Sequence, residues 1–201
     1  MPLHVPPAPA PALRSVLTAL RSPTAVHQPR TPDAVRNARR TLRPEFSLPI
    51  HEMAQVGRAG DGAPTRLTGW RFLLRDTDAP DDSASVGAAE AILTADGWAF
   101  AHFTEGPYVT STERALQQAE SLPAAYQPRL LSVPEMYMLT LWLHADTDAD
   151  AGQGTPDPSD LLIPLAPAPP GIAAHQPHRV DGLLSLLTRR VMSPPLLKTP
   201  V

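Results

Sequence analysis

Three side chains of this sequence could carry acid–base chemistry if the fold brings them together. They are His102, Glu105 and His144, which lie at the ends of two stretches expected to be strands. A histidine beside a carboxylate can act as a general acid or base, or can help to hold a metal ion. The grouping requires the two strands to be neighbours, and a partly exposed strand histidine without such a role is the usual case. A small enzyme built on these residues is therefore our alternative hypothesis.

An acidic stretch after Trp142 has the oxygen spacing of a calcium-binding loop. Carboxylates stand at relative positions 1, 3, 5 and 12 of a twelve-residue loop, as Asp146, Asp148, Asp150 and Asp157. The pattern is incomplete, because alanine occupies position 6, where the loop needs glycine, and position 12 is Asp instead of the longer Glu. We expect a solvated acidic loop, with metal binding as the alternative.

A predicted helix start carries hydroxyl groups that could hold an anion. Thr110, Ser111 and Thr112 precede Arg114, and Thr110 with Glu113 has the spacing of a capping box. The free backbone N–H groups and the dipole at a helix N-terminus attract anions. Ordinary helix capping explains the same residues, so anion binding is a second alternative.

Composition excludes several other kinds of site. The chain contains no cysteine, which removes disulfides, thiolate nucleophiles and cysteine-ligated metals. The nucleophilic-serine motif, the P-loop and the glycine-rich dinucleotide motif are absent. His175 and His178 have an HxxH spacing, but Pro177 prevents the helix that would place them on one face. We therefore predict no cofactor.

Charge is distributed unevenly, although the net charge is only −3. Residues 76–160 contain fifteen of the twenty acidic residues and two arginines, whereas residues 1–50 contain seven arginines and two acidic residues. A basic arm beside an acidic body can contact an anionic partner or fold back on its own surface. The predicted basic helix around residues 36–43 lacks aromatic residues that could stack on bases, so we expect no nucleic-acid binding.

Residue usage also bears on source and location. Sixteen arginines against one lysine, with abundant alanine and proline, is typical of translation from a GC-rich genome and favours a bacterial source. The lack of cysteine fits the reducing cytoplasm. No stretch approaches the roughly 20 apolar residues that span a bilayer. We therefore expect a cytoplasmic protein without a membrane span.

Aromatic residues and prolines divide the chain into a core and two flanks. All ten aromatic residues lie between Phe46 and Trp142, whereas 20 of the 26 prolines lie outside residues 51–145. Aromatic side chains supply the largest apolar area, whereas proline interrupts helices and central strands. We predict a partly disordered Pro/Arg-rich arm with short helices, an α+β core domain, and a linker with a C-terminal helix, over residues 1–45, 46–166 and 167–201 respectively.

Hydrophobic periodicity predicts the individual elements. We expect helices near residues 13–20, 32–43, 110–122 and 181–192, and strands at 66–75, 86–95, 98–104, 136–144 and 160–166. Asp96-Gly97 is typical of a type I′ hairpin turn, and the stretch 129–144 also has a helical interpretation. Because hairpin connections dominate, we predict an α+β fold with a small antiparallel sheet of about five strands and helices packed on one face.

The leading functional hypothesis is a non-catalytic protein-interaction or accessory protein with a protein partner. It is favoured by the lack of a catalytic constellation and by proline-rich flanks whose ordering requires a partner surface. The alternatives are the small enzyme and the anion- or calcium-binding module described above.

Overall fold

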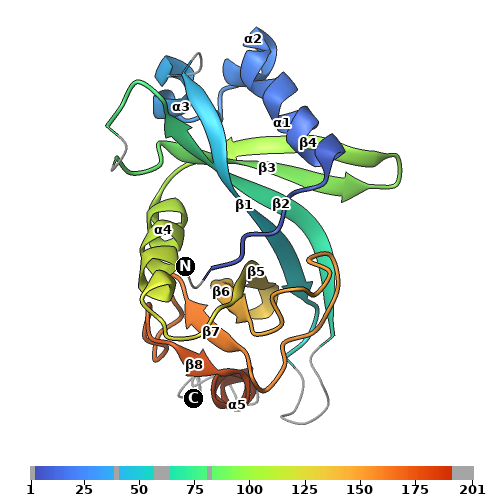
Figure 1. The fold of residues 1–201 in the computed structure, drawn as a ribbon, viewed down its shortest axis with the longest axis vertical. Helices are drawn as coiled ribbons and strands as arrows, with labels where there is room; N and C mark the ends of the chain where they lie inside the picture. The colour runs from blue at the N-terminus through green and yellow to red at the C-terminus, as the bar shows by residue number, and fades with distance from the viewer. Residues whose placement is uncertain (1–2, 39–40, 57–63, 81–82, 192–201) are drawn as a thin grey trace, which may run out of the picture.

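The computed structural model describes residues 3–38, 41–56, 64–80 and 83–191. Eight strands form one mixed sheet in the order β4-β3-β2-β1-β5-β6-β7-β8 (Figure 1). The strands are β1 (Leu42–Met53), β2 (Thr65–Asp76), β3 (Gly87–Thr94), β4 (Gly97–Thr104), β5 (Gln127–Val133), β6 (Met138–His144), β7 (Leu161–Pro164) and β8 (His178–Arg179). Neighbouring strands are antiparallel, except for the parallel pair β1 and β5.

The centre of the sheet is formed by its two longest strands, β1 and β2, which pair along most of their length. Side chains of β2 alternate between the two faces, so that Trp70 and Phe72 enter one core cluster and Leu73 enters another. Strand β5 pairs with β1 only at residues 50–52. Two antiparallel halves are therefore joined by one short parallel contact.

Helices cover both faces of this sheet (Figure 1). They are α1 (Ala10–Arg21), α2 (Pro23–Val26), α3 (Asp33–Ala38), α4 (Pro107–Glu120) and α5 (Val180–Val191), with a 3-10 turn η1 (Pro134–Met136). The apolar stripe of α1 buries Val16 and Leu20 in the cluster that holds Trp70 and Phe72. Helix α4 packs its apolar side chains on the opposite face, where Leu73 lies. Among the described residues, no helix has both the length and the apolar character needed to cross a membrane.

The prediction of a small antiparallel sheet with helices on one face was wrong. The sheet has eight strands, is mixed, and carries helices on both faces, although the α+β character is consistent with the prediction. The largest omission is β1, which contains Pro44 and Pro49, whereas the first strand predicted from the sequence was at residues 66–75. A register shift follows Pro44, and β5 pairs with β1 only beyond Pro49. One side of β1 has no strand partner at either proline, which lowers the cost of the missing N–H groups.

Several predicted elements are confirmed. The hairpin of β3 and β4 forms as predicted, but its turn residues are Ala95 and Asp96, and Gly97 pairs with Thr94 as the first residue of β4. Neither turn residue has the positive φ that a type I′ turn requires, so the prediction of that turn at Asp96-Gly97 was wrong. The stretch 129–144 is not a helix: it splits into β5, η1 and β6. Strand β7 forms within the predicted range 160–166 and pairs with β6, but β8 pairs with its other side, so β7 is not at the edge of the sheet. The predicted helix at 32–43 is shortened to α3, and Arg39 and Arg40 of its basic face lie outside the described residues.

Residues 3–9, which we call the N-terminal segment, cross the sheet from α1 to the start of β5 (Figure 1). Leu3 forms an isolated bridge with Tyr126, and the His4 backbone N–H donates to the Tyr126 carbonyl over 2.8 Å. The Ser47 hydroxyl of β1 donates to the carbonyl of Pro6. The proline-rich start of the chain therefore lies against the sheet, and α1 belongs to the packed core.

Candidate functional site

A buried polar cluster lies where β1, β5 and β6 meet residues 145–160, which we call the acidic loop. Its members come from segments far apart in the sequence: His51, Gln127, Arg129, Trp142, His144 and Asp160. Four of them, apart from Trp142 and His144, are classed as buried polar or charged residues. Since a buried polar group costs free energy unless it is hydrogen-bonded, the partners of each member decide what the cluster does.

Asp160 is a fully buried carboxylate that gathers donors from the start and the end of the acidic loop. Its oxygens accept hydrogen bonds from Trp142 Nε1 at 2.6 Å and from His144 Nδ1 at 2.9 Å. Backbone N–H groups of Ala145 and Asp157 donate to it at 2.8 and 2.9 Å. Four donors therefore converge on one carboxylate and join both ends of the acidic loop to β6.

Arg129 is the corresponding buried cation, and its donors are directed at the middle of the acidic loop. Its guanidinium donates to Gln127 Oε1 at 2.7 Å, to the Gln153 carbonyl at 2.5 Å and to the Asp150 carbonyl at 3.1 Å. It also lies over the Trp142 ring, 4.8 Å from the centroid. Burial lowers the pKa of Arg129, and the nearby carboxylates, chiefly that of Asp160, oppose this shift.

His51 lies beneath the loop as a buried, neutral imidazole. Its Nε2–H donates to the Ala151 carbonyl over 2.9 Å, and its Nδ1 has no hydrogen-bond partner among the described residues. Burial, together with the charge of Arg129, lowers the pKa of His51 to about 4, against the smaller opposing effect of the hydrogen bond to Ala151. His51 is therefore uncharged at neutral pH, which avoids a second cation next to Arg129.

The cluster contains residue types that are common in catalytic sites, but their hydrogen bonds hold the acidic loop in place. Asp160 orients His144 through Nδ1, an arrangement that leaves Nε2 as the ring atom able to exchange a proton. Gln127 Nε2, two donors of Arg129 and the carboxylate of Asp160 bond to loop backbone, and the remaining donor of Arg129 bonds to Gln127. Because these bonds are internal and buried, the geometry serves positioning of the loop and leaves a substrate few groups to contact.

The candidate catalytic residues do not converge. His102 lies on β4 and His144 on β6, which are five strand positions apart, roughly 24 Å along the sheet. His102 is exposed, and its Nε2 lies 3.8 Å from Glu90 Oε2. Glu90 Oε1 accepts hydrogen bonds from Arg71 Nη2 at 2.6 Å and from Arg71 Nε at 2.9 Å. Glu105 is exposed after the end of β4. His102 thus lies beside the Arg71–Glu90 ion pair of β2 and β3 and not in the cluster around His144.

The four carboxylates of the candidate metal loop are not grouped into a metal site. The carboxylates of Asp146, Asp150 and Asp157 accept hydrogen bonds from backbone N–H groups two residues further on, which forms local turns. Asp148 is exposed on the loop. Among the described residues, no group of three or more His, Asp or Glu side chains is arranged to hold a metal ion.

The predicted anion site falls inside a helix and not at its start. Helix α4 begins at Pro107, with Gly106 as its cap, so the hydroxyl residues lie beyond the first free N–H groups. The Thr112 hydroxyl donates to the Tyr108 carbonyl, and Thr110 is exposed, as is Arg114. Glu113 accepts from the backbone and hydroxyl of Ser85 and does not close a capping box.

Ser111 instead forms a pair with His175 that the sequence pattern did not indicate. Its hydroxyl oxygen lies 3.1 Å from His175 Nε2 and accepts from the Ala166 N–H at 2.7 Å. Burial, and then the charge of Arg114, lower the pKa of His175, so its Nε2 is available as an acceptor. Ser111 is buried, however, and no carboxylate of the described residues bonds to His175 Nδ1. The pair joins α4 to the segment after β7.

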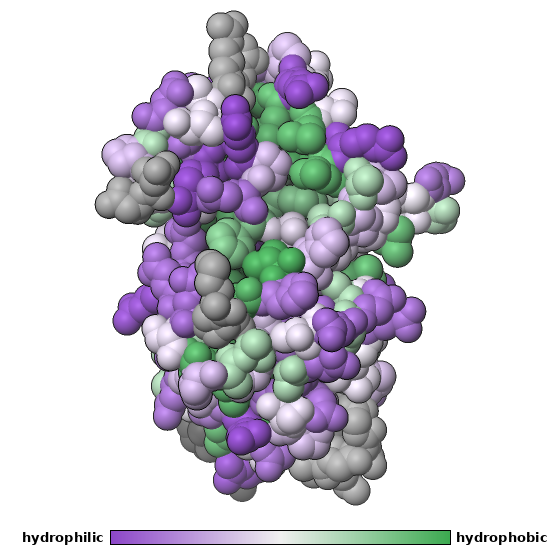
Figure 2. Space-filling model, viewed as in Figure 1, coloured by the Kyte–Doolittle hydropathy of each residue, from purple (hydrophilic) through white to green (hydrophobic). Residues whose placement is uncertain are grey.

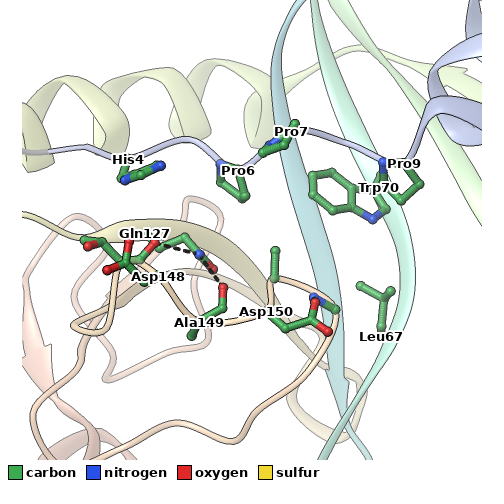
Figure 3. Close-up of a pocket in the computed structure, with 13 residues that line it drawn as sticks. His4, Pro6, Pro7, Pro9, Leu67, Trp70, Gln127, Asp148, Ala149 and Asp150 are labelled. Carbon is green, nitrogen blue, oxygen red and sulfur yellow. Dashed lines mark hydrogen bonds between the residues drawn. The ribbon is translucent and has the colours of Figure 1, made fainter.

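A pocket of about 450 Å³ opens beside the cluster, between the N-terminal segment and the acidic loop (Figure 3). Its walls are prolines of the N-terminal segment, two residues of β2, and residues of the loop: Pro6, Pro7, Pro9, Leu67, Trp70, and 147–152. Gln127 holds the loop wall, since its Nε2 donates to the carbonyls of Thr147 and Ala149.

No family model, curated protein or solved structure matches this chain.

Proposed function

We propose that this chain is a non-catalytic protein-interaction protein that binds an extended segment of a partner protein along β4. The observation that carries the proposal is the position of β4 at the end of the sheet, where it pairs with β3 alone among the described strands. The outer edge of such a strand presents backbone N–H and C=O groups to which another strand can be added. We place the protein in the cytoplasm, on the basis of its lack of cysteine.

The β4 edge lacks the devices that usually prevent pairing with other chains. Residues 97–104 contain no proline, lysine, arginine, aspartate or glutamate. Trp98 and Phe100 are half-buried on this strand, and aromatic residues are enriched in protein interfaces. The tip of β3 adds Ile92 and Leu93, which are 41% and 50% exposed. This combination supports a pairing surface with apolar contacts above and below the strand.

Apolar surface continues next to this edge. Figure 2 shows hydrophobic surface gathered over α1, the helix that packs across β3 and β4. Leu13 and Leu17 of α1 are half-buried and contribute to this apolar surface. A partner strand beside β4 would therefore meet apolar side chains of α1 on one face of the sheet and Ile92 on the other.

The buried polar cluster supports a non-catalytic role, because its charged groups cannot reach a substrate. Asp160 and Arg129 are closed to solvent and bonded to the protein's own loop. Groups that perform catalysis have to reach a substrate within hydrogen-bond distance. The buried side chains of Asp160 and Arg129 are thus committed to structure, whereas the outer edge of β4 has no strand partner among the described residues.

We expect Ala99→Lys to abolish partner binding without unfolding the chain. Ala99 lies on β4 opposite the exposed Ile92, so a lysine there places a charge on the edge and a long side chain in the path of a partner. The measurement is the apparent mass of the chain by size-exclusion chromatography of native extract with immunodetection. Gln117→Lys, on the exposed surface of α4, adds the same charge as a control.

The wild type and Gln117→Lys should elute in a complex, and Ala99→Lys should elute as a monomer. A wild-type chain that elutes as a monomer in extract would refute the proposal. If the purified chain alone is a dimer that Ala99→Lys dissociates, the edge is used but its occupant is a second copy, which would refute the choice of partner.

A further inference from the structure

We propose that the pocket between the N-terminal segment and the acidic loop binds a lysine or arginine residue, with its apolar stem inside and its cation at the loop. This site is separate from the β4 edge, and the inference does not depend on the function proposed above. Three features of the pocket carry it: the apolar walls, an unused donor on Trp70 and a negative rim.

The walls suit an aliphatic stem. Pro6, Pro9 and Leu67 surround Trp70, and the volume of about 450 Å³ is within the range of small-ligand pockets. Proline rings and an indole offer apolar surface that is rigid, so little side-chain freedom is lost when a ligand binds. A long, flexible side chain that ends in a charge fits such walls by burying its methylene groups.

Trp70 supplies the donor that a peptide carbonyl would need. The residue is 2% exposed, and its Nε1 has no hydrogen-bond partner among the described residues. Figure 3 shows the nitrogen-bearing edge of the ring turned toward Leu67 and Asp150, across the pocket. A buried donor without an acceptor is unfavourable, so a ligand carbonyl that reaches this N–H removes that cost by accepting its hydrogen bond. This feature favours an amino-acid residue over a simple amine.

The rim of the pocket selects a cation. Asp148 and Asp150 line it and are exposed, and the Asp148 carboxylate has no hydrogen-bond or ion-pair partner among the described residues. One oxygen of Asp150 accepts from the Gly152 N–H, which fixes that carboxylate in place. Among the described lining residues His4 is the one basic side chain. An anionic ligand would meet two carboxylates here and is therefore disfavoured.

The buried cluster keeps these carboxylates in position. Gln127 bonds to the carbonyls on either side of Asp148, and Arg129 bonds to the carbonyl of Asp150 itself. Both side chains are buried and bonded to one another over 2.7 Å. The binding loop is thus organised before the ligand arrives, which reduces the entropic cost of binding.

The test follows the indole N–H signal of Trp70 in ¹H–¹⁵N spectra of the full chain, assigned by its loss in Trp70→Phe. The probes are Nα-acetyl-arginine amide, the neutral isostere Nα-acetyl-citrulline amide, and n-butylamine. We expect the arginine amide to shift the signal saturably and the citrulline amide to bind more weakly. Asp148→Asn should lower the affinity for the arginine amide about 2- to 5-fold, which is the effect of losing one exposed ion pair. Asp78→Asn, which removes an exposed carboxylate on another loop, should leave affinity unchanged.

Each outcome decides a part of the inference. Saturable binding of n-butylamine as strong as that of the arginine amide would identify free amines as the natural source, whereas no shift with the amine would identify a peptide residue. A Trp70 signal that does not move with either cation would overturn the site. Equal affinity of the arginine amide for the wild type and Asp148→Asn would overturn the role of the rim, as would equal binding of the citrulline amide.

Discussion

Replacing Arg129 by methionine is expected to lower the free energy of unfolding by about 3 kcal/mol. Methionine fills a similar volume but cannot donate to Gln127 Oε1 or to the carbonyls of Asp150 and Gln153. Each acceptor left without a donor costs about 1–3 kcal/mol, reduced where water reaches the loosened loop. Asp160 also loses the cation that compensates its buried charge. Urea unfolding measures the total, and hydrogen exchange at Gly152 reports whether the acidic loop opens.

Arg66→Met is the matched control for this substitution. Arg66 forms an ion pair with Glu52 at 2.7 Å, but its side chain is 68% exposed. Exposed pairs contribute about 0–1 kcal/mol. If Arg129→Met were no more destabilising than Arg66→Met, Arg129 would not be the residue that organises the loop.

Lowering the pH from 7 to 4 is expected to remove about 3 kcal/mol of stability through His51 alone. The pKa of His51 is about 4 in the folded chain and 6.5 in the unfolded chain, and each unit of difference corresponds to 1.36 kcal/mol. Between these values the unfolded state binds the proton and the folded state does not, so stability falls as the pH falls. The effect is absent above about pH 7 and complete below about pH 4.

His51→Gln isolates this contribution from all other titrating groups. Glutamine cannot titrate, and its amide can donate to the Ala151 carbonyl as His51 Nε2 does. The wild type should lose about 3 kcal/mol more than His51→Gln between pH 7 and pH 4 in urea unfolding. Parallel pH profiles of the two proteins would show that His51 protonates as readily when folded as when unfolded.

The parts of the fold that the sequence predicts are those set by local pattern. The β3–β4 hairpin, α1 and α5 follow from alternation, the Asp96-Gly97 pair and helical periodicity, all of which act within about twelve residues. Strand β1 was not predicted, and it contains two prolines, which cannot donate a backbone hydrogen bond to a neighbouring strand. That property excludes proline only from positions with a strand partner on both sides. Its parallel contact with β5 depends on a long connection through β2, β3, β4 and α4, and no local signal encodes it.

The polar cluster could be predicted only in fragments. His144 was recognised, but its partner is Asp160, which begins a short apolar run and gave no signal of its own. Arg129 did offer one, because it is one of only two arginines within the acidic residues 76–160 and precedes a strongly apolar stretch. A charged side chain beside an apolar strand has to be buried with hydrogen-bonding partners or has to lie outside the sheet. His51 lies on a strand that was not predicted, so its meeting with Arg129 could not be inferred.

Site-specific photo-cross-linking tests the central claim, that the β4 edge is the binding surface, most directly. A benzophenone amino acid replaces Leu93, which is 50% exposed next to the edge, or Tyr137, which is 91% exposed far from it in the turn before β6. In living cells the proposal predicts one cross-linked protein at position 93, none at position 137, and loss of the product when Ala99→Lys is added. A cross-link at position 137 alone, or one at position 93 that survives Ala99→Lys, would contradict it.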